Sequence, residues 1–366
     1  MRTRSEHPDY ILLVVILMLV TIGVVMVYSA SFPLSLLRFD HQWHFVSRQL
    51  LWALFGIIAM IVASRINYWK WQQLSNVLLA ITLLLLLLVF VPGIGVTVQG
   101  STRWIDLGFF NMQPSEVAKI ALVLWVAARL AQKEGTLLNF WRGTLPIISL
   151  TGIMAGLVLR QPDLSTAVVL VLSAGFVLFA GGLPWGQIAL LLGLGVSALY
   201  LGIISAEYRL ARFMTFLDPW KDPTDAGYQI IQSLYAIGLG GVFGRGLGAS
   251  IQKHFFLPEP HNDFIFAVTS EEFGFFGGAV LIALFALLAV RGLRIAIRSP
   301  DKFGGFLATG ITAMIVAQAF MNIAVVTGSV PVTGITLPLI SSGGSSLVIV
   351  MGSLGILLNI SKYSRE

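Results

Sequence analysis

The 366-residue sequence contains no cysteine, and only 11% of its residues are charged. The absence of cysteine excludes disulfide bonds, thiolate nucleophiles and zinc sites built from cysteine. The scarcity of charge accompanies a hydrophobic content of 57% and a mean hydropathy of +0.87. This composition is typical of integral membrane proteins, and we expect one integral membrane domain over residues 1–366.

Several sequence patterns are also missing. The chain has no tandem repeat of roughly 20 to 50 residues. Neither the dinucleotide-binding fingerprint nor the P-loop motif is present, so a Rossmann or P-loop nucleotide site is not supported. Histidine occurs five times, and His41 with His44 is a poor pair of metal ligands without further donors.

Ten apolar runs predict ten membrane-spanning helices, although several are shorter than the roughly 20 residues that cross a bilayer upright. The first run ends near the small residues 29–31, which resemble a signal-peptide cleavage site. It is longer than a signal-peptide core of roughly 7 to 15 residues, so we expect a retained membrane anchor. The predicted fold class is an all-α polytopic membrane protein with about ten transmembrane helices over 10–29, 49–64, 74–91, 115–131, 145–159, 166–181, 186–204, 264–290, 306–328 and 344–360.

Lysine and arginine predict the orientation in the membrane. With a cytoplasmic N-terminus, 13 of the 23 basic and 5 of the 17 acidic residues fall inside, giving net charges of +8 inside and −2 outside. This distribution follows the positive-inside rule and explains the basic composition without nucleic acid as a partner. We therefore expect both termini in the cytoplasm, a long extracytoplasmic loop over 205–263 between helices seven and eight, and a second outer segment over 92–114.

The motif QPSEVAK places ionisable residues at the outer start of the fourth helix. Glu116 and Lys119 are three residues apart and can pair on one helix face. Pro114 suits the first helical turn, where its missing N–H costs nothing. The pair is either a self-satisfied ion pair at the interface or one wall of a polar cavity.

The motif RQPDLST, residues 160–166, is a second outer polar cluster. Asp163, Ser165 or Thr166 can cap the sixth helix, which is the simpler explanation. Alternatively, Arg160 beside Asp163 offers a cation for a phosphate group.

Two glycine-rich segments follow on the outer side. Six glycines lie between Gly238 and Gly248, with Arg245 among them. They either present backbone N–H groups to an anion or pack flexibly against the membrane surface. The segment GSVPVTGITLPLISSGGSS, residues 328–346, predicts irregular backbone that lines a wet cavity, because such backbone is not tolerated against lipid.

Four carboxylates occur in FFLPEPHNDFIFAVTSEEFG, residues 255–274. If the eighth helix begins near Asn262, Asp263 lies in the first turn, where the helix dipole favours a carboxylate. Glu271 then stands about 80° from Asp263 around the helix, and Glu272 lies on the opposite side. Asp263 is the candidate for the mouth of a cavity and Glu271 is the next candidate, unless Asp263 merely caps the helix.

The chain resembles the SEDS family (shape, elongation, division and sporulation) over almost its whole length, through the segments GSTRWIDLGFFNMQPSEVAK, RQPDLST, FLDPWKDPTDAGYQIIQSLYAIGLGG, FLPEPHNDFIFAVTSEEFG and PVTGITLPLISSGGSS. LDPWKDP and QSLYAIG are more similar to the division and sporulation members, FtsW and SpoVE, than to RodA. Two residues differ from the usual sequence motifs of the family. Ser342 occupies a position where tyrosine is frequent, and Ser165 occupies a position where glycine is frequent.

The resemblance implies a peptidoglycan glycosyltransferase that polymerises lipid II by inverting transfer on the outer face of the bacterial cytoplasmic membrane, during division, elongation or sporulation. It also implies a class B penicillin-binding protein as the cross-linking partner. The family's essential aspartate maps onto Asp263, the expected general base. The groove residues map onto Arg103, Trp104, Gln113, Ser115, Glu116, Lys119 and Asp163.

The leaving diphosphate requires positive charge. The candidates are a divalent cation, Mg²⁺ or Mn²⁺, or side chains among Arg103, Lys119, Arg160, Arg209, Arg212 and Arg245. A flippase for the lipid-linked precursor is the alternative function, although transporter sites usually lie near the midplane between repeated halves. A non-enzymatic division scaffold is a third possibility, but it leaves the outer polar motifs unexplained.

Overall fold

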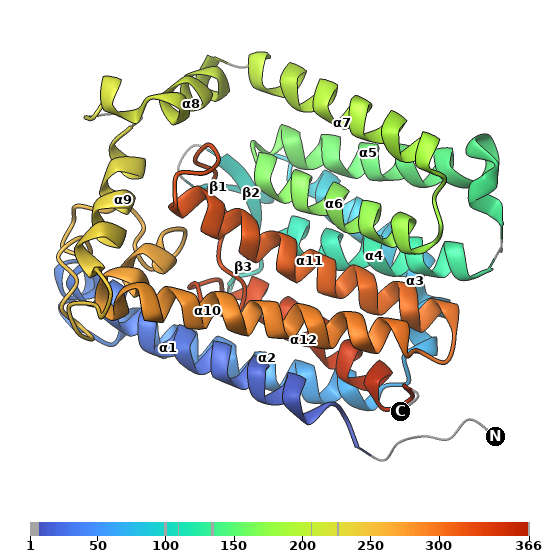
Figure 1. Cartoon of the computed structure of the whole chain (residues 1–366), viewed down its shortest axis with the longest axis horizontal. Coiled ribbons are helices and arrows are strands. Elements are labelled where there is room, and N and C mark those ends of the chain that lie inside the picture. The colour runs from blue at the N-terminus through green and yellow to red at the C-terminus, as the bar shows by residue number, and fades with distance from the viewer. Residues whose placement is uncertain are drawn as a thin grey trace.

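The computed structural model describes residues 7–98, 101–108, 110–132, 135–205, 207–224 and 227–364. Within these ranges ten helices correspond to the ten predicted spans and confirm the all-α membrane fold (Figure 1). In the part of the chain that the structure describes, seven helical segments are long and apolar enough to cross a membrane. The ten helices are α1 (Tyr10–Phe39), α2 (His44–Arg65), α3 (Trp69–Leu88), α4 (Pro114–Gln132), α5 (Leu145–Arg160), α6 (Leu164–Ala180), α7 (Trp185–Ile204), α10 (Ile265–Ile297), α11 (Lys302–Val326) and α12 (Ser345–Ser361).

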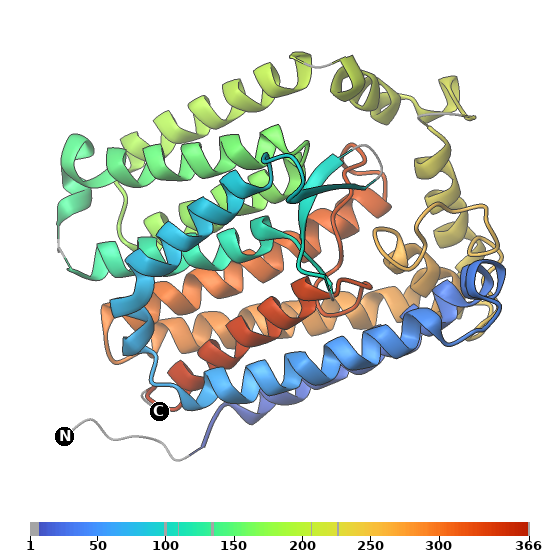
Figure 2. The ribbon, with the colours of Figure 1, turned by 180° about the vertical axis from the view of Figure 1, so that it is seen from behind.

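The described residues between α3 and α4 include a small antiparallel sheet in the order β1-β2-β3 (Figure 2). Its strands are β1 (Gly95–Val98), β2 (Ser101–Asp106) and β3 (Asn111–Met112). Valine, threonine and tryptophan in these short runs suit extended backbone. The sheet leads into α4, which begins at Pro114 as predicted.

The described part of the long segment between α7 and α10, which was predicted as a long loop over 205–263, is partly helical. It contains α8 (Glu207–Leu217) and α9 (Tyr228–Gly240), with a short 3₁₀ turn, Pro219–Lys221, between them. In α8 the spacing i, i+3, i+4, i+7 gives one apolar face, formed by Leu210, Phe213, Met214 and Leu217. A second 3₁₀ turn, Thr136–Leu138, and a π-helical turn, Phe140–Thr144, precede α5.

Helix α11 lies in the middle of the bundle and packs against α4, α6 and α10 (Figure 1). Close approach is possible because α11 carries a small residue at the crossing. A Cβ at Gly310 would lie 2.4 Å from Val123 and 2.7 Å from Val177. In contrast, no residue of α7 is buried, so α7 lies at the edge of the bundle.

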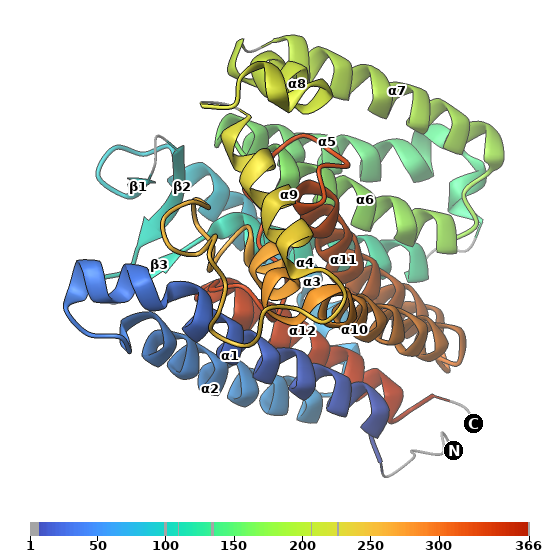
Figure 3. The same cartoon turned by 60° about the vertical axis from the view of Figure 1, so that its left-hand side comes forward.

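Both ends of the described chain lie at the same end of the bundle (Figure 3). The Asp9 backbone N–H donates to Ser361 Oγ at 3.0 Å, and Arg291 Nε donates to Asp9 Oδ2 at 2.8 Å. The small residues 29–31, considered above as a cleavage site, lie inside α1 and are buried. Some charges used for the orientation lie outside the described residues: Arg2, Arg4, Glu6, Lys133, Glu134, Asp225, Arg365 and Glu366.

The glycine-rich segment crosses α10 at a break in that helix. Gly274 has φ 66° and ψ −161°, which interrupts the helical backbone. The Phe275 N–H donates to Gly241 O at 2.9 Å, and the Arg245 N–H donates to Glu271 O at 3.0 Å. A Cβ at Gly244 would lie 2.2 Å from Glu272 O, so only glycine fits this crossing. The glycines therefore provide close packing.

Candidate active site

A cavity of about 620 Å³ lies at the end of the bundle away from the termini. The motifs QPSEVAK, RQPDLST and PEPHNDF and the segment before α12 all contribute to its wall, whereas the glycine-rich segment between residues 238 and 248 does not. Its ionisable lining residues are Arg38, Arg48, Arg103, Glu116, Asp163, Arg212, Glu259, His261 and Asp263.

Asp263 lies in the turn before α10, two residues ahead of Ile265, and not in the first helical turn as predicted. Its backbone carbonyl accepts a hydrogen bond from Asn322 Nδ2 at 2.8 Å. Its carboxylate lines the cavity and accepts no hydrogen bond from the described residues. A Cβ at Gly334 would lie 3.0 Å from Asp263 Oδ2, so this glycine leaves room for the carboxylate.

The surroundings of Asp263 change its acidity. Burial, followed by repulsion from Glu259, raises the pKa of Asp263 to about 7, while Arg103 and Arg212 oppose this shift. A carboxyl group with a pKa near neutrality can take up and return a proton at neutral pH. Asp263 therefore has the properties of a general base.

His261 precedes Asp263 by two residues and also lines the cavity. Its ring packs against Phe45 with 4.6 Å between centroids. Burial lowers the pKa of His261, so the imidazole is neutral at pH 7. Its backbone carbonyl accepts the Ser342 N–H at 3.0 Å, a contact that any non-proline residue at position 342 can make.

Glu116 and Lys119 form the predicted ion pair, and both are buried. Lys119 Nζ donates to Glu116 Oε1 at 2.9 Å and also to Gln318 Oε1. Glu116 Oε2 accepts from Ser346 Oγ at 2.7 Å, and Gln318 Nε2 donates to Thr336 O at 3.1 Å. The network joins α4, α11 and the segment before α12, with Glu116 on the cavity wall and Lys119 behind it.

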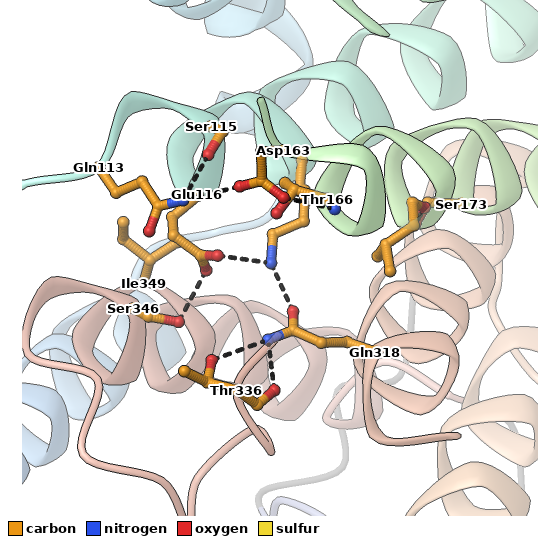
Figure 4. A network of polar contacts seen from close by, with 12 residues as sticks. Gln113, Ser115, Glu116, Asp163, Thr166, Ser173, Gln318, Thr336, Ser346 and Ile349 are labelled. Atoms are coloured by element: carbon orange, nitrogen blue, oxygen red, sulfur yellow. Dashed lines mark hydrogen bonds and ion pairs between the residues drawn. The ribbon is translucent and has the colours of Figure 1, made fainter. Parts of the chain in front are cut away.

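Asp163 is the N-cap of α6, because its Oδ1 accepts the Thr166 N–H at 3.0 Å. The capping explanation is therefore confirmed, but Asp163 also lines the cavity. Its Oδ2 accepts from Gln113 Nε2 at 3.1 Å (Figure 4). Arg103 lies 3.9 Å from the same oxygen and donates to the backbone carbonyls of residues 161 and 162.

The structure brings together seven of the residues predicted to form the site: Arg103, Trp104, Gln113, Glu116, Asp163, Arg212 and Asp263 line the cavity. Ser115 and Lys119 lie directly behind this wall. Ser115 Oγ accepts from Gln113 Nε2 at 3.0 Å, and Lys119 is held by Glu116.

Four predicted substrate contacts lie away from the cavity lining. Arg160 and Arg245 are exposed elsewhere on the surface. Arg209 donates to Gly202 O at 2.8 Å. Glu271 accepts from Ser250 Oγ at 2.5 Å and from the backbone N–H of residue 251 at 2.7 Å, so its carboxylate fastens that turn and does not reach the cavity.

The sequence interpretation missed other residues of the site. Arg38 and Arg48 line the cavity from the α1–α2 hairpin, and His261 lines it from the turn before α10. Asn322 and Gln318 support the site from α11, four residues apart on one face. Polar residues at this spacing in an apolar helix were the available signal.

Within the described ranges, no group of three or more histidine, aspartate or glutamate side chains is arranged to hold a metal ion. The divalent cation therefore stays a prediction. Mg²⁺ is commonly bound by one or two carboxylates together with substrate phosphates, and the carboxylates that line the cavity are those of Glu116, Asp163, Glu259 and Asp263.

Comparison with known proteins gives a consistent result. The profile of the family described as "Cell cycle protein", which groups FtsW, RodA and SpoVE, matches residues 10–366. Stage V sporulation protein E of Bacillus subtilis is 45% identical over 365 residues, covering 100% of both chains. The probable peptidoglycan glycosyltransferase FtsW of a Geobacter species is 46% identical over 366 residues, covering 99% of both.

Solved structures show the same fold. RodA of Thermus thermophilus superposes with a TM-score of 0.73 at 30% identity, covering 99% of both chains. A chain described under "Structural coordination of polymerization and crosslinking by a peptidoglycan synthase complex" gives a TM-score of 0.79 at 30% identity, covering 97% of this chain and 98% of that one. This multi-pass membrane protein therefore belongs to the FtsW, RodA and SpoVE family.

Proposed function

We propose that the protein is a peptidoglycan glycosyltransferase that polymerises lipid II into glycan strands. The observation that carries the proposal is a carboxylate, Asp263, that faces a polar cavity with its pKa raised to about 7 and no hydrogen bond from the described residues. The relatives named as peptidoglycan glycosyltransferases support the same reaction class.

In the proposed reaction, the acceptor hydroxyl attacks the anomeric carbon of the lipid-linked donor. Asp263 takes the hydroxyl proton as the new C–O bond forms, and the bond from the anomeric carbon to the diphosphate oxygen breaks. Attack opposite the diphosphate inverts the configuration at that carbon. A positioned general base contributes roughly 10² to 10⁴ in rate.

The departing diphosphate is stabilised by cationic side chains of the cavity. Arg212 lines the cavity, and its charge acts on Asp263. Arg212 is therefore suited to stabilise the negative charge of the diphosphate near the base. The polyprenyl tail lies in the apolar surroundings of the helices. This mechanism needs one carboxylate. Glycoside hydrolysis differs, because a second carboxyl group assists the leaving group there.

The proposed setting is the bacterial cytoplasmic membrane, with both termini in the cytoplasm and the cavity on the outer face. The predicted excess of basic residues at the end that carries the termini supports this orientation. A class B penicillin-binding protein is the proposed partner. The similarity to a chain of a synthase complex that coordinates polymerisation and cross-linking supports it.

The test is glycan formation from lipid II in proteoliposomes that contain the full chain and its penicillin-binding protein. We expect Asp263→Asn to abolish polymerisation while expression and partner binding are unchanged. Retained polymerisation would falsify the assignment of Asp263 as the base. Translocation of labelled lipid II in the same vesicles without polymer would favour the flippase alternative.

A further inference from the structure

The cavity contains two cations that the proposed reaction has not used. Arg38 lies in the last turn of α1, and Arg48 lies near the start of α2. Both line the cavity. Neither guanidinium makes a hydrogen bond or an ion pair with the described residues. A guanidinium group that faces a cavity and has no protein partner there is suited to bind a phosphate group through two hydrogen bonds.

The other sequence-predicted cations are less available for a ligand. Arg103 donates to backbone carbonyls of the hairpin before α6 and lies beside Asp163. Lys119 is buried behind the wall and donates to Glu116 and Gln318. The arginine pair of the α1–α2 hairpin is therefore a separate source of positive charge.

The hairpin that carries this pair is held in a fixed shape. Ser35 Oγ donates to His41 O at 2.8 Å. The Phe39 and His44 rings stack with 3.5 Å between centroids, and Trp43 stacks on Tyr28 at 5.2 Å. These contacts order the backbone that carries both arginines. The entropy cost of binding a ligand is therefore lower than for arginines on a flexible loop.

The two side chains that the turn before α10 presents to the cavity have different neighbours. The His261 ring packs on Phe45 of α2 with 4.6 Å between centroids, and the charge of Arg38 acts on this ring. The Asp263 carboxylate lies beside Gly334 instead, where a Cβ would be 3.0 Å from Oδ2. The hairpin arginines therefore belong to the His261 side of the cavity.

The chemistry of the proposed reaction requires two diphosphates at different distances from Asp263. The donor diphosphate is bonded to the carbon under attack, so it lies close to the reacting atoms, on the face of that carbon opposite the attacking hydroxyl and Asp263. The acceptor diphosphate lies at the other end of its disaccharide, away from the attacking hydroxyl. Building on the proposed function, we propose that Arg38 and Arg48 form the subsite for the diphosphate of the acceptor lipid.

The test separates the two substrates kinetically. A lipid II analogue with a blocked terminal hydroxyl can act only as donor, and it is supplied in excess while unmodified lipid II is varied as acceptor. We expect Arg38→Ala and Arg48→Ala each to raise KM for the acceptor about tenfold, because a charge-assisted hydrogen bond is lost. KM for the blocked donor, varied at saturating acceptor, stays unchanged. Arg38→Lys and Arg48→Lys keep the charge but lose the fork, so their effects are intermediate.

The control is Lys221→Ala, which removes one positive charge from an exposed residue of the turn between α8 and α9, outside the cavity lining. A higher KM for the donor in the arginine variants would overturn the acceptor assignment. All assays use vesicles of phosphatidylcholine alone and vesicles that also contain phosphatidylglycerol. An effect seen only with phosphatidylglycerol would mean that the pair binds phospholipid headgroups, which overturns the proposal.

A direct binding assay separates this inference from the proposed function. Binding of undecaprenyl diphosphate to vesicles with the Asp263→Asn protein is compared with and without the two arginines. Weaker binding in the arginine variants supports a diphosphate subsite even if the wild-type protein forms no glycan. Unchanged binding, with normal polymerisation by the wild-type protein, rejects the subsite and leaves the proposed function intact.

Discussion

Asn322 of α11 holds Asp263 through the backbone, because its Nδ2 donates to Asp263 O at 2.8 Å and to Ile335 O at 2.7 Å. Asn322 is fully buried. One amide group thus joins the turn before α10 to the segment before α12. The Asp263 side chain has no hydrogen bond of its own from the described residues, so its direction depends on this backbone support.

We expect Asn322→Ala to lower kcat for glycan formation by roughly 10- to 100-fold, because small displacements of a reacting group are costly. KM should change little, since Asn322 does not line the cavity. Thr312→Val is the matched control, because it removes a buried hydrogen bond from the same helix at a distance from Asp263. Equal losses in both variants would indicate a general packing effect.

The raised pKa of Asp263 predicts the pH dependence of the reaction. A general base must be deprotonated, so the rate should fall as the pH drops below about 7. Repulsion from Glu259 contributes to this shift, so Glu259→Gln should lower the pKa of Asp263 and move the acidic limb to lower pH. The measurement is kcat/KM against pH for both proteins. Coincident acidic limbs would refute the electrostatic coupling.

The helical fold was predictable because apolar runs of about 20 residues have few alternatives in a membrane. The motifs QPSEVAK and RQPDLST stood out for a related reason, since ionisable residues beside apolar spans are rare. Arg38 and Arg48 were not predicted as site residues, because arginines commonly flank the ends of membrane helices. Their contact with the cavity depends on how the α1–α2 hairpin packs against the turn at His261, which is a long-range property.

Glu271 and Arg245 show a second limit of sequence interpretation. Glu271 was predicted from its place near Asp263, and Arg245 from the glycine-rich segment. The turn that follows this segment binds the Glu271 carboxylate away from the cavity, and the Arg245 N–H donates to Glu271 O. The glycine-rich segment crosses α10 at the break at Gly274. The break arises from contacts between Gly244 and Gly274, thirty residues apart, which periodicity along one helix does not reveal.

The buried Glu116–Lys119 pair predicts unequal effects of single and double substitutions. Lys119→Met leaves the Glu116 carboxylate buried without its cation, at a cost of about 3–5 kcal/mol. The double variant Glu116→Gln/Lys119→Met removes both charges, so it should be more stable than Lys119→Met alone. Thermal unfolding and glycan formation are measured for each. Equal losses of activity in the single and double variants would instead favour direct contact of the pair with substrate.

The crossing of α9 and α10 predicts different results for two glycines that are two residues apart. A Cβ at Gly240 would lie 2.0 Å from the backbone oxygen of Ser270, whereas a Cβ at Gly238 meets nothing within 4 Å. Gly240→Ala must push the helices apart, and we expect a loss of about 1–3 kcal/mol in stability. Gly238→Ala should be neutral or stabilising by up to about 1 kcal/mol, since alanine favours helix. Thermal unfolding of both variants in the same detergent decides the matter. Similar melting temperatures would contradict the close packing of this crossing, and with it the physical reason for glycines between residues 238 and 248.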